Sequence, residues 1–408
     1  MIFANNFYLL FFIFSNLFCN APKPEVQPFK KEIIKVLEAT PILTGADQTD
    51  KYLPLLKGLR VGLLVNQTSI VGSQHLVDVL KEKGVNVTAI FAPEHGFRGD
   101  ADAGQELTNS VDKETGIPVI SIYGKKKGPD QADLANVDVV VFDVQDVGTR
   151  FYTYLSTLKY LMEACAEFKK PLMILDRPNP NAHYIDGPVL EMENTSFVGI
   201  IPIPIVHGMT LGELGWMMNA EGMLKDKIKC ELKVIQCGNY DHFKPYILPV
   251  KPSPNLPNQV SIMLYPSLCL FEGTNFSVGR GTDKQFQVYG SPIAKKGDFY
   301  FTPQPKPGAM TPFLQGKKCR GYDLSNLSIE KIRTEGKINL TYFLQAYKDY
   351  PDKANFFLKN NFIDLLMGTK KFQQQVKSGM SEAEIRASWK EGIDKFKITR
   401  KKYLLYPN

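Results

Sequence analysis

Side chains capable of acid/base chemistry follow apolar runs that predict β-strands. Glu94 and His95 come directly after residues 85–91, a β-branched and aromatic run typical of a buried strand. Pro93 ends this strand, because proline cannot donate a hydrogen bond to a β-ladder. In open α/β sheets, ligands bind just beyond the carboxyl ends of the strands. Glu94 and His95 are therefore candidate catalytic residues.

Predicted strands and helices alternate along the first two thirds of the chain. The strands are expected at residues 60–65, 85–91, 117–123, 137–142, 172–175, 202–206 and 231–235. The helices between them are expected at residues 75–83, 151–168 and 211–221. The last of these follows Thr210 and Glu213, which have the spacing of a capping box. This alternation indicates an α/β fold with a parallel sheet and right-handed crossovers.

Several of these strands end in polar residues, which would meet at one edge of a parallel sheet. We expect the polar side chains to point into one crevice beside Glu94. They add three candidate catalytic carboxylates, Asp143, Asp146 and Asp176. They also add three candidate substrate-binding residues, Asn66, Arg150 and Arg177. The two arginines are expected to offset the repulsion between the carboxylates.

Several motifs of other enzyme classes are absent from the sequence. No G-x-G-x-x-G follows a strand, and there is no P-loop, G-x-S-x-G, H-E-x-x-H or C-x-x-C motif. We therefore expect no cofactor and no metal. A metal site built from His95, Asp143 and Asp146 stays open as an alternative. The remaining set of carboxylates, amides and arginines suits acid/base hydrolysis of a hydroxyl-rich substrate such as a sugar.

Length and charge limit the other classes. The chain has 408 residues, of which 44% are hydrophobic, enough for two domains with ordinary cores. Its formal net charge of +7 is spread along the chain, without the basic and aromatic clustering of a nucleic-acid-binding protein. Prolines are dense over residues 245–257, which predicts a domain boundary there. Domains are therefore expected over residues 51–250 and 259–408.

The second domain opens with short apolar runs at residues 261–264 and 268–271 and ends in predicted helix. Between them lies Arg280, flanked by Gly279 and Gly281. Two glycines free the backbone there, either to cradle an anion or to form a plain tight turn. Near the C-terminus, Ser381 and Glu384 have the spacing of another capping box.

The N-terminus predicts export. Residues 7–14 form an uncharged apolar run with the length of a signal-peptide core, and residues 1–21 are expected to be a signal peptide. Residues 22–50 are expected to be a tether and entry segment. We therefore expect a periplasmic or cell-envelope location, with membrane attachment only if Cys19 carries a lipid. In an exported protein Cys230 could pair with Cys237, which the sequence leaves open.

Six long motifs together resemble one enzyme family. They lie at residues 93–99, 142–154, 175–180, 206–210, 252–257 and 271–275. In this order they are similar to the exo-acting β-N-acetylmuramidases, a bacterial glycoside hydrolase family long described as a domain of unknown function. The resemblance covers about residues 55–408. It implies a Rossmann-like domain, a smaller α+β auxiliary domain and a cleft between them.

The resemblance also implies an activity, the release of N-acetylmuramic acid from the non-reducing end of peptidoglycan fragments. The partners would be muropeptides or disaccharides derived from peptidoglycan, and the family's proposed catalytic glutamate maps to Glu94. The motifs add Tyr152, Asn179 and Glu272 as candidate substrate-binding residues. Arg98 or Arg280 would bind the lactyl carboxylate of muramic acid. A non-catalytic cell-wall sugar-binding protein and a metal-dependent hydrolase stay open as alternatives.

Overall fold

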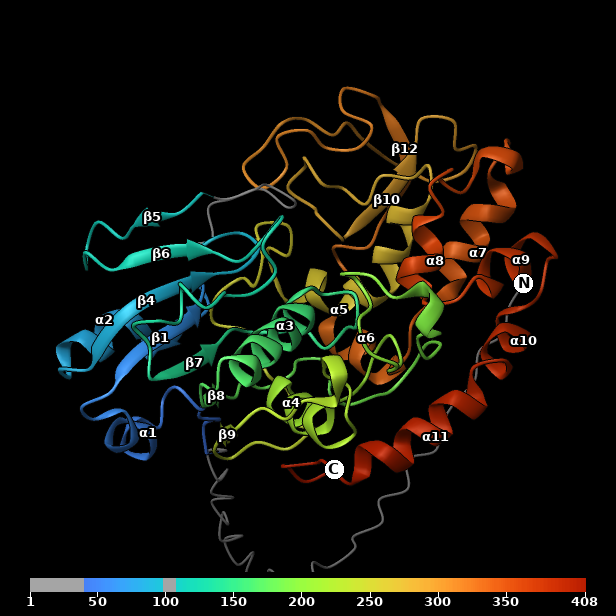
Figure 1. Ribbon diagram of the computed structural model, residues 1–408. Helices are drawn as coiled ribbons and strands as arrows, with labels where there is room; N and C mark the ends of the chain where they lie inside the picture. The colour runs from blue at the N-terminus through green and yellow to red at the C-terminus, as the bar shows by residue number, and fades with distance from the viewer. Residues whose placement is uncertain (1–39, 98–107) are drawn as a thin grey trace, which may run out of the picture. The chain divides into compact units, whose positions relative to one another are not determined.

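A mostly parallel β-sheet organises the N-terminal part of the protein (Figure 1). The computed structural model describes residues 40–97 and 108–408, and residues 41–408 form one compact unit. Seven strands pair into this sheet within the described residues. In spatial order they are β5 (Ser110–Val111), β6 (Pro118–Ser121), β4 (Asn86–Ala92), β1 (Arg60–Val65), β7 (Val139–Asp143), β8 (Leu172–Leu175) and β9 (Leu232–Ile235).

The strand order is that of a Rossmann-like fold. Every pair except β5–β6 is parallel. Numbered along the chain, the six parallel strands have the order 3-2-1-4-5-6. The order reverses beside β1, whose two neighbours are β4 and β7. The predicted α/β fold with a parallel sheet is therefore confirmed.

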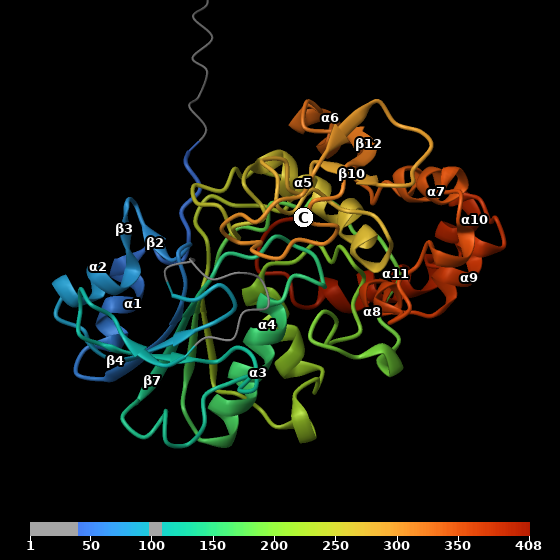
Figure 2. The same cartoon turned by 90° about the horizontal axis from the view of Figure 1, so that it is seen from above.

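Both faces of the sheet are buried, because side chains of a strand alternate between its two faces. Leu64, Phe91 and Phe142 point to one face and belong to the larger core. Leu63 and Ile90 point to the other face and belong to a second core. Figure 2 shows helices covering each face. On the second-core side these are α1 (Thr49–Leu56) and α2 (Leu76–Glu82), and on the other side α3 (Tyr154–Glu167) and α4 (Leu211–Ala220).

The C-terminal part is smaller and combines helices with an antiparallel sheet, as expected for an α+β domain. Among the described residues its sheet has the order β10 (Val288–Ser291), β12 (Cys319–Asp323) and β11 (Phe299–Phe301). Its helices are α5 (Gln259–Leu268), α6 (Ile329–Glu335), α7 (Leu340–Asp349), α8 (Phe362–Met367), α9 (Lys371–Lys377), α10 (Glu382–Ala387) and α11 (Lys390–Lys401).

One expectation about local structure is wrong, and two apolar runs that the sequence left unassigned are now placed. Residues 202–206 form no strand, because Val206 pairs only through isolated bridges to Thr149 and Asp186. The apolar runs at 261–264 and 268–271 belong to α5 and the short 3-10 helix Cys269–Gly273 that follows it. These segments are buried all round, and a short apolar run cannot distinguish a buried strand from a buried helix by its period.

Caps and cysteines give two further outcomes. Both predicted capping boxes are present, at the N-termini of α4 and α10. Cys230 and Cys237 are separate free thiols, so the disulfide left open by the sequence does not form in this structure. No helix in the described part of the chain is long and apolar enough to cross a membrane.

Arg150 joins the two parts of the protein. Its side chain is fully buried, and its guanidinium donates hydrogen bonds to the carbonyl oxygens of Pro188 (2.7 Å), Ile203 (2.6 Å) and Leu366 in α8 (3.0 Å). Burial lowers the pKa of Arg150 to about 9, so the group stays charged at neutral pH. A side chain at Gly368 would collide with this guanidinium, since a Cβ there would lie 2.7 Å from Nη2.

We expect the substitution Arg150→Ala to lower the free energy of unfolding by about 3–5 kcal/mol, because three buried carbonyl groups lose their donor. Urea denaturation at neutral pH measures this loss. Lys395→Ala is the control, since it removes an exposed cation from α11 and is expected to cost less than about 0.5 kcal/mol. A similar small loss for Arg150→Ala would contradict the role of Arg150 in joining the two parts.

Candidate active site

A cavity of about 380 Å³ lies beyond the carboxyl end of β4. Residues from both parts of the protein line it. The N-terminal part contributes Glu94, His95, Tyr123, Lys127, Phe151, Tyr152, Thr153, Tyr154, Phe197 and Val198. The proline-rich connection contributes Ser253, Asn255 and Leu256, and the C-terminal part contributes Tyr265, Cys269, Glu272, Arg280, Phe286, Phe362 and Leu366. A second hollow of about 680 Å³ shares Glu94, Tyr123, Glu272, Arg280 and Phe362 with it. The volume of the first cavity, about 380 Å³, suits a small polar ligand such as a sugar.

Glu94 is held in the cavity wall by two hydroxyl groups. Tyr123 donates to its Oε1 (3.0 Å), and Thr153 donates to its Oε2 (2.5 Å). The turn that carries Glu94 is tight, since Gly96 N donates to Pro93 O (3.0 Å) and His95 has a φ of +70°. Burial and the Glu94 carboxylate raise the pKa of Tyr123, so Tyr123 stays a neutral donor. Glu94 thus has a fixed orientation, as an acid/base residue requires.

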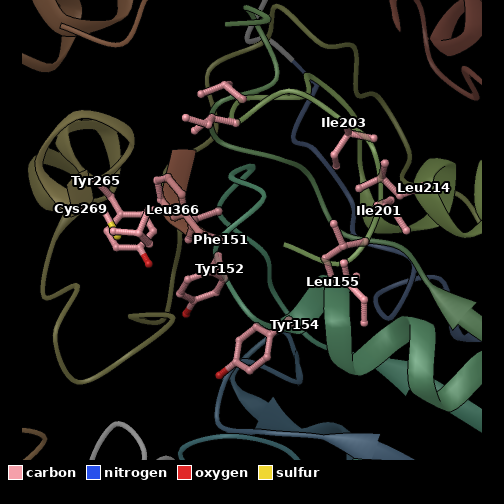
Figure 3. Close-up of a cluster of buried hydrophobic side chains, with 14 of the residues drawn as sticks. Phe151, Tyr152, Tyr154, Leu155, Ile201, Ile203, Leu214, Tyr265, Cys269 and Leu366 are labelled. Carbon is pink, nitrogen blue, oxygen red and sulfur yellow. The ribbon is translucent and has the colours of Figure 1, made fainter. Parts of the chain in front are cut away.

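Aromatic rings also line the cavity, and Figure 3 shows those of Phe151, Tyr152, Tyr154 and Tyr265. Tyr152 meets Tyr154 edge to face at 5.0 Å between ring centroids, and it meets Tyr265 of α5 at 5.9 Å. The phenol of Tyr152 donates to the carbonyl oxygen of Pro252 (2.8 Å). Figure 3 shows Tyr265 of α5 and Cys269 of the 3-10 helix that follows it facing Phe151 and Tyr152. Rings held in this way offer rigid apolar surface against which a sugar can pack.

A second carboxylate, Glu272, lies in the same cavity and is paired with Arg280. Arg280 Nε donates to Glu272 Oε1 at 2.6 Å. The loop around Arg280 is tight, since Gly279 and Gly281 have φ values of +81° and +78°. The guanidinium also lies over the ring of Phe286, at 4.9 Å. The structure therefore brings together five of the predicted residues, Glu94, His95, Tyr152, Glu272 and Arg280.

The other described candidates do not line this cavity, which corrects the expectation of a single polar crevice. Asp143 is fully buried and paired with Arg177, whose Nε and Nη2 donate to its two carboxylate oxygens at 2.5 and 2.8 Å. Burial raises the pKa of Asp143 despite this pairing. Asn66 is also buried, and its Nδ2 donates to the hydroxyl of Tyr154 (2.8 Å).

Asp176 and Asn179 have local structural partners. Asp176 accepts from Gly212 N (2.9 Å) at the start of α4 and from the hydroxyls of Thr210 and Tyr406 (both 2.6 Å). Burial raises the pKa of Asp176 to about 6. Asn179 Nδ2 donates to Met209 O (2.8 Å). Arg150 contacts carbonyl groups and does not offset the carboxylates, whereas Arg177 does so for Asp143. A buried polar group needs a hydrogen-bond partner. Most of the polar side chains at the strand ends therefore bond to other protein groups and do not face the cavity.

Asp146 and His207 form a buried pair behind the cavity. Asp146 Oδ2 accepts from Gly148 N (2.6 Å) and lies 4.0 Å from His207 Nε2. Within the described residues, Asp146 Oδ1 and His207 Nε2 have no hydrogen-bond partner. Burial raises the pKa of Asp146 to about 7 and lowers that of His207 to about 3. Both side chains are therefore largely neutral between about pH 3 and about pH 7.

Two predictions remain, the role of Arg98 and the alternative metal site. Arg98 lies outside the described residues. The described residues contain no group of three or more His, Cys, Asp and Glu side chains that could hold a metal ion. The alternative metal site is not assembled, because Asp143 is paired with Arg177 and Asp146 is buried against His207.

Several residues of the cavity wall were not predicted from the sequence. Tyr123 follows β6 and could have been found by the strand-end argument applied to Glu94. Thr153 and Asn255 lie inside the quoted motifs at 142–154 and 252–257. Lys127 and Phe197 carried no signal, since they come from connecting segments that only the fold brings to the cavity.

The Rossmann-like fold and this site, in which two carboxyl groups border a cavity with aromatic walls, define an enzyme that hydrolyses its substrate with carboxyl groups. Family models for the N-terminal and C-terminal parts of the exo-β-N-acetylmuramidase NamZ match residues 61–260 and 263–406. The chain belongs to this glycoside hydrolase family, and the resemblance inferred from its motifs is confirmed.

A characterised relative and two solved structures support this assignment. The chain is 40% identical over 387 residues to the peptidoglycan β-N-acetylmuramidase NamZ of Bacillus subtilis strain 168, covering 90% of this chain and 91% of that protein. A DUF1343 family protein of Bacteroides fragilis NCTC 9343 is 48% identical, with a TM-score of 0.84 over 90% of this chain and 100% of its own. A second one is 29% identical, with a TM-score of 0.74 over 90% and 99%.

The raised pKa of Asp146 predicts how stability depends on pH. The folded protein keeps the proton up to about pH 7, whereas the unfolded chain loses it near about pH 4. The stabilisation from Asp146 is therefore full below about pH 4 and is lost as pH rises through about 7. The free energy of unfolding of the wild type minus that of Asp146→Asn should fall by about 2–3 kcal/mol from about pH 5 to about pH 7. Urea denaturation of both proteins at both pH values measures this change. If the stability difference between wild type and Asp146→Asn is the same at the two pH values, the pKa of Asp146 is not raised.

Proposed function

We propose that this protein is an exo-acting β-N-acetylmuramidase that releases N-acetylmuramic acid from the non-reducing end of peptidoglycan fragments, with Glu94 as its acid/base residue. The observation that carries the assignment of Glu94 is its fixed position in the cavity wall. Tyr123 and Thr153 orient its two oxygens, and Glu94 lies in the motif at residues 93–99 that resembles the family.

Glu94 would transfer the proton at the scissile bond. In its protonated form it donates to the glycosidic oxygen as the bond between C1 and that oxygen breaks, and in its ionised form it accepts a proton from the attacking water. Hydroxyl groups can both donate and accept hydrogen bonds. Tyr123 and Thr153 can therefore stay in contact with Glu94 in both protonation states.

The aromatic wall would bind the sugar and limit access of water. Tyr152 and Tyr265 are buried and hold each other by edge-to-face contact, so the wall loses little conformational entropy when a substrate binds. Glu272 borders the same cavity and is the second carboxyl group there. Its pairing with Arg280 supports a role in positioning the Arg280 loop.

The place of action follows from the substrate. Peptidoglycan lies outside the cytoplasmic membrane, and the apolar run at residues 7–14 supports export to the periplasm or the cell envelope. This location is part of the proposal.

Glu94→Gln removes the transferable proton and keeps the shape of the side chain. We expect kcat/KM on a chromogenic β-N-acetylmuraminide to fall by about 10²–10⁴-fold, with little change in the thermal midpoint. Glu272→Gln is the matched variant in the same cavity and should reduce the rate less. A Glu94→Gln rate within about threefold of the wild type would exclude the assigned role.

The same assay separates the alternatives. A non-catalytic sugar-binding protein would bind N-acetylmuramic acid without turnover of the chromogenic glycoside. A metal-dependent hydrolase would lose activity in EDTA, whereas we expect full activity after EDTA treatment because proton transfer by Glu94 needs no metal.

A further inference from the structure

The proposed substrate carries a group that its common analogue lacks. N-acetylmuramic acid differs from N-acetylglucosamine by a lactyl ether whose carboxylate is ionised at neutral pH. A cavity that selects this group needs a cation whose charge is not already neutralised by a protein carboxylate. Among the described residues that line the cavity, Lys127 and Arg280 are the lysine and arginine side chains.

Arg280 already has a carboxylate partner. Its Nε donates to Glu272 Oε1 at 2.6 Å, and Phe286 covers one face of the guanidinium. The charges of Arg280 and Glu272 therefore largely cancel within the cavity wall. The predicted role of Arg280 in binding the lactyl carboxylate would require it to share its charge with Glu272.

Lys127 has no such partner within the described residues. Its ammonium group lies over the ring of Phe197, 4.2 Å from the centroid, and 5.4 Å from the ring centroid of Tyr123. The adjacent Lys126 differs, because Asp130 (2.7 Å) and Asp133 neutralise it away from the cavity. Lys127 is half-buried and lines the cavity, and among the described residues its ammonium lies beside aromatic faces.

The surface beneath Lys127 is rigid. Phe197 stacks on Tyr160 of α3 at 6.3 Å between centroids, and Ser156 of the same helix donates to Phe197 O (2.7 Å). The loop that carries Lys127 lies close against α3, since a Cβ at Gly128 would lie 3.1 Å from Tyr160 O. The ammonium is thus placed by packed neighbours on α3.

Tyr123 connects this cation to the acid/base residue. Its hydroxyl donates to Glu94 Oε1 at 3.0 Å, while its ring lies beside both Lys127 and Phe197. A sugar whose glycosidic oxygen meets Glu94 would therefore lie beside Tyr123, whose ring also borders Lys127. Tyr123 therefore contacts both the acid/base residue and the ammonium group of Lys127.

We propose that Lys127 is a specificity-determining residue, whose ammonium group binds the lactyl carboxylate of the substrate. This inference rests on the proposed muramidase function. Binding would move the ammonium from the aromatic faces to the carboxylate, while Arg280 stays with Glu272. Because Lys127 has no carboxylate partner among the described residues, its binding to the lactyl carboxylate would not break an ion pair within them.

Three chromogenic substrates test the inference: the β-N-acetylmuraminide, its lactyl carboxamide and the β-N-acetylglucosaminide. Lys127→Met keeps the apolar stem of the side chain and removes its charge. We expect kcat/KM on the muraminide to fall by about 10- to 100-fold, and kcat/KM on the two uncharged substrates to change by less than about threefold. Lys127→Arg should recover most of the preference for the carboxylate.

Lys126→Met is the matched control, since it removes the neighbouring lysine charge and should leave all three rates unchanged. An equal loss on all three substrates, or no loss on the muraminide, would overturn the role of Lys127. Failure of the wild type to hydrolyse the muraminide would refute the proposed function separately. In that case, calorimetry measures the binding of free N-acetylmuramic acid and free N-acetylglucosamine and tests the role of Lys127 without turnover. The inference is supported only if Lys127→Met weakens the binding of N-acetylmuramic acid and leaves the binding of N-acetylglucosamine unchanged.

Discussion

The contact between the N-terminal and C-terminal parts of the protein depends on the hydrogen bonds of the buried Arg150 guanidinium. A charged group so deep in a protein is costly unless polar partners replace its water. Here carbonyl groups of Pro188, Ile203 and Leu366 do so, and Leu366 belongs to α8, which contributes to the cavity wall. The same contact explains Gly368, because any side chain there would displace the guanidinium.

Buried polar side chains at the strand ends also need partners, and those that find partners inside the protein are not available to bind substrate. In a Rossmann-like sheet the crevice at the reversal of strand order, beside β1, would be the default binding site. In this protein Ser69 donates to Asp143 O there, and the Asp143–Arg177 pair and Asn66 fill the same region. Glu94, one strand away at the end of β4, is the strand-end carboxylate that reaches the cavity among the described residues.

Among the described residues, the charged groups of the cavity wall come from both parts of the protein. Glu272 and Arg280 neutralise each other in the C-terminal part of the wall. Glu94 and Lys127 come from the N-terminal part, and Tyr123 contacts both of them. A carboxyl group for proton transfer and an ammonium group for an anionic substituent match the two features that define a muramic acid glycoside, its acetal and its carboxylate. The geometry thus connects specificity and catalysis through one aromatic side chain.

The sequence by itself determined the parallel sheet, the place of Glu94 at a strand end and the family. These features depend on local periods, on proline and on long contiguous motifs, which act over a few residues. Tertiary structure decided which polar residues became internal partners, because Asp143 and Arg177, or Asp176 and Tyr406, are distant in sequence and meet only when the sheet and the C-terminal segment pack. It also decided that Lys127 lies in the cavity and Lys126 does not. A one-residue difference in a loop has no period or motif, and only the packing of that loop on α3 orients the two side chains.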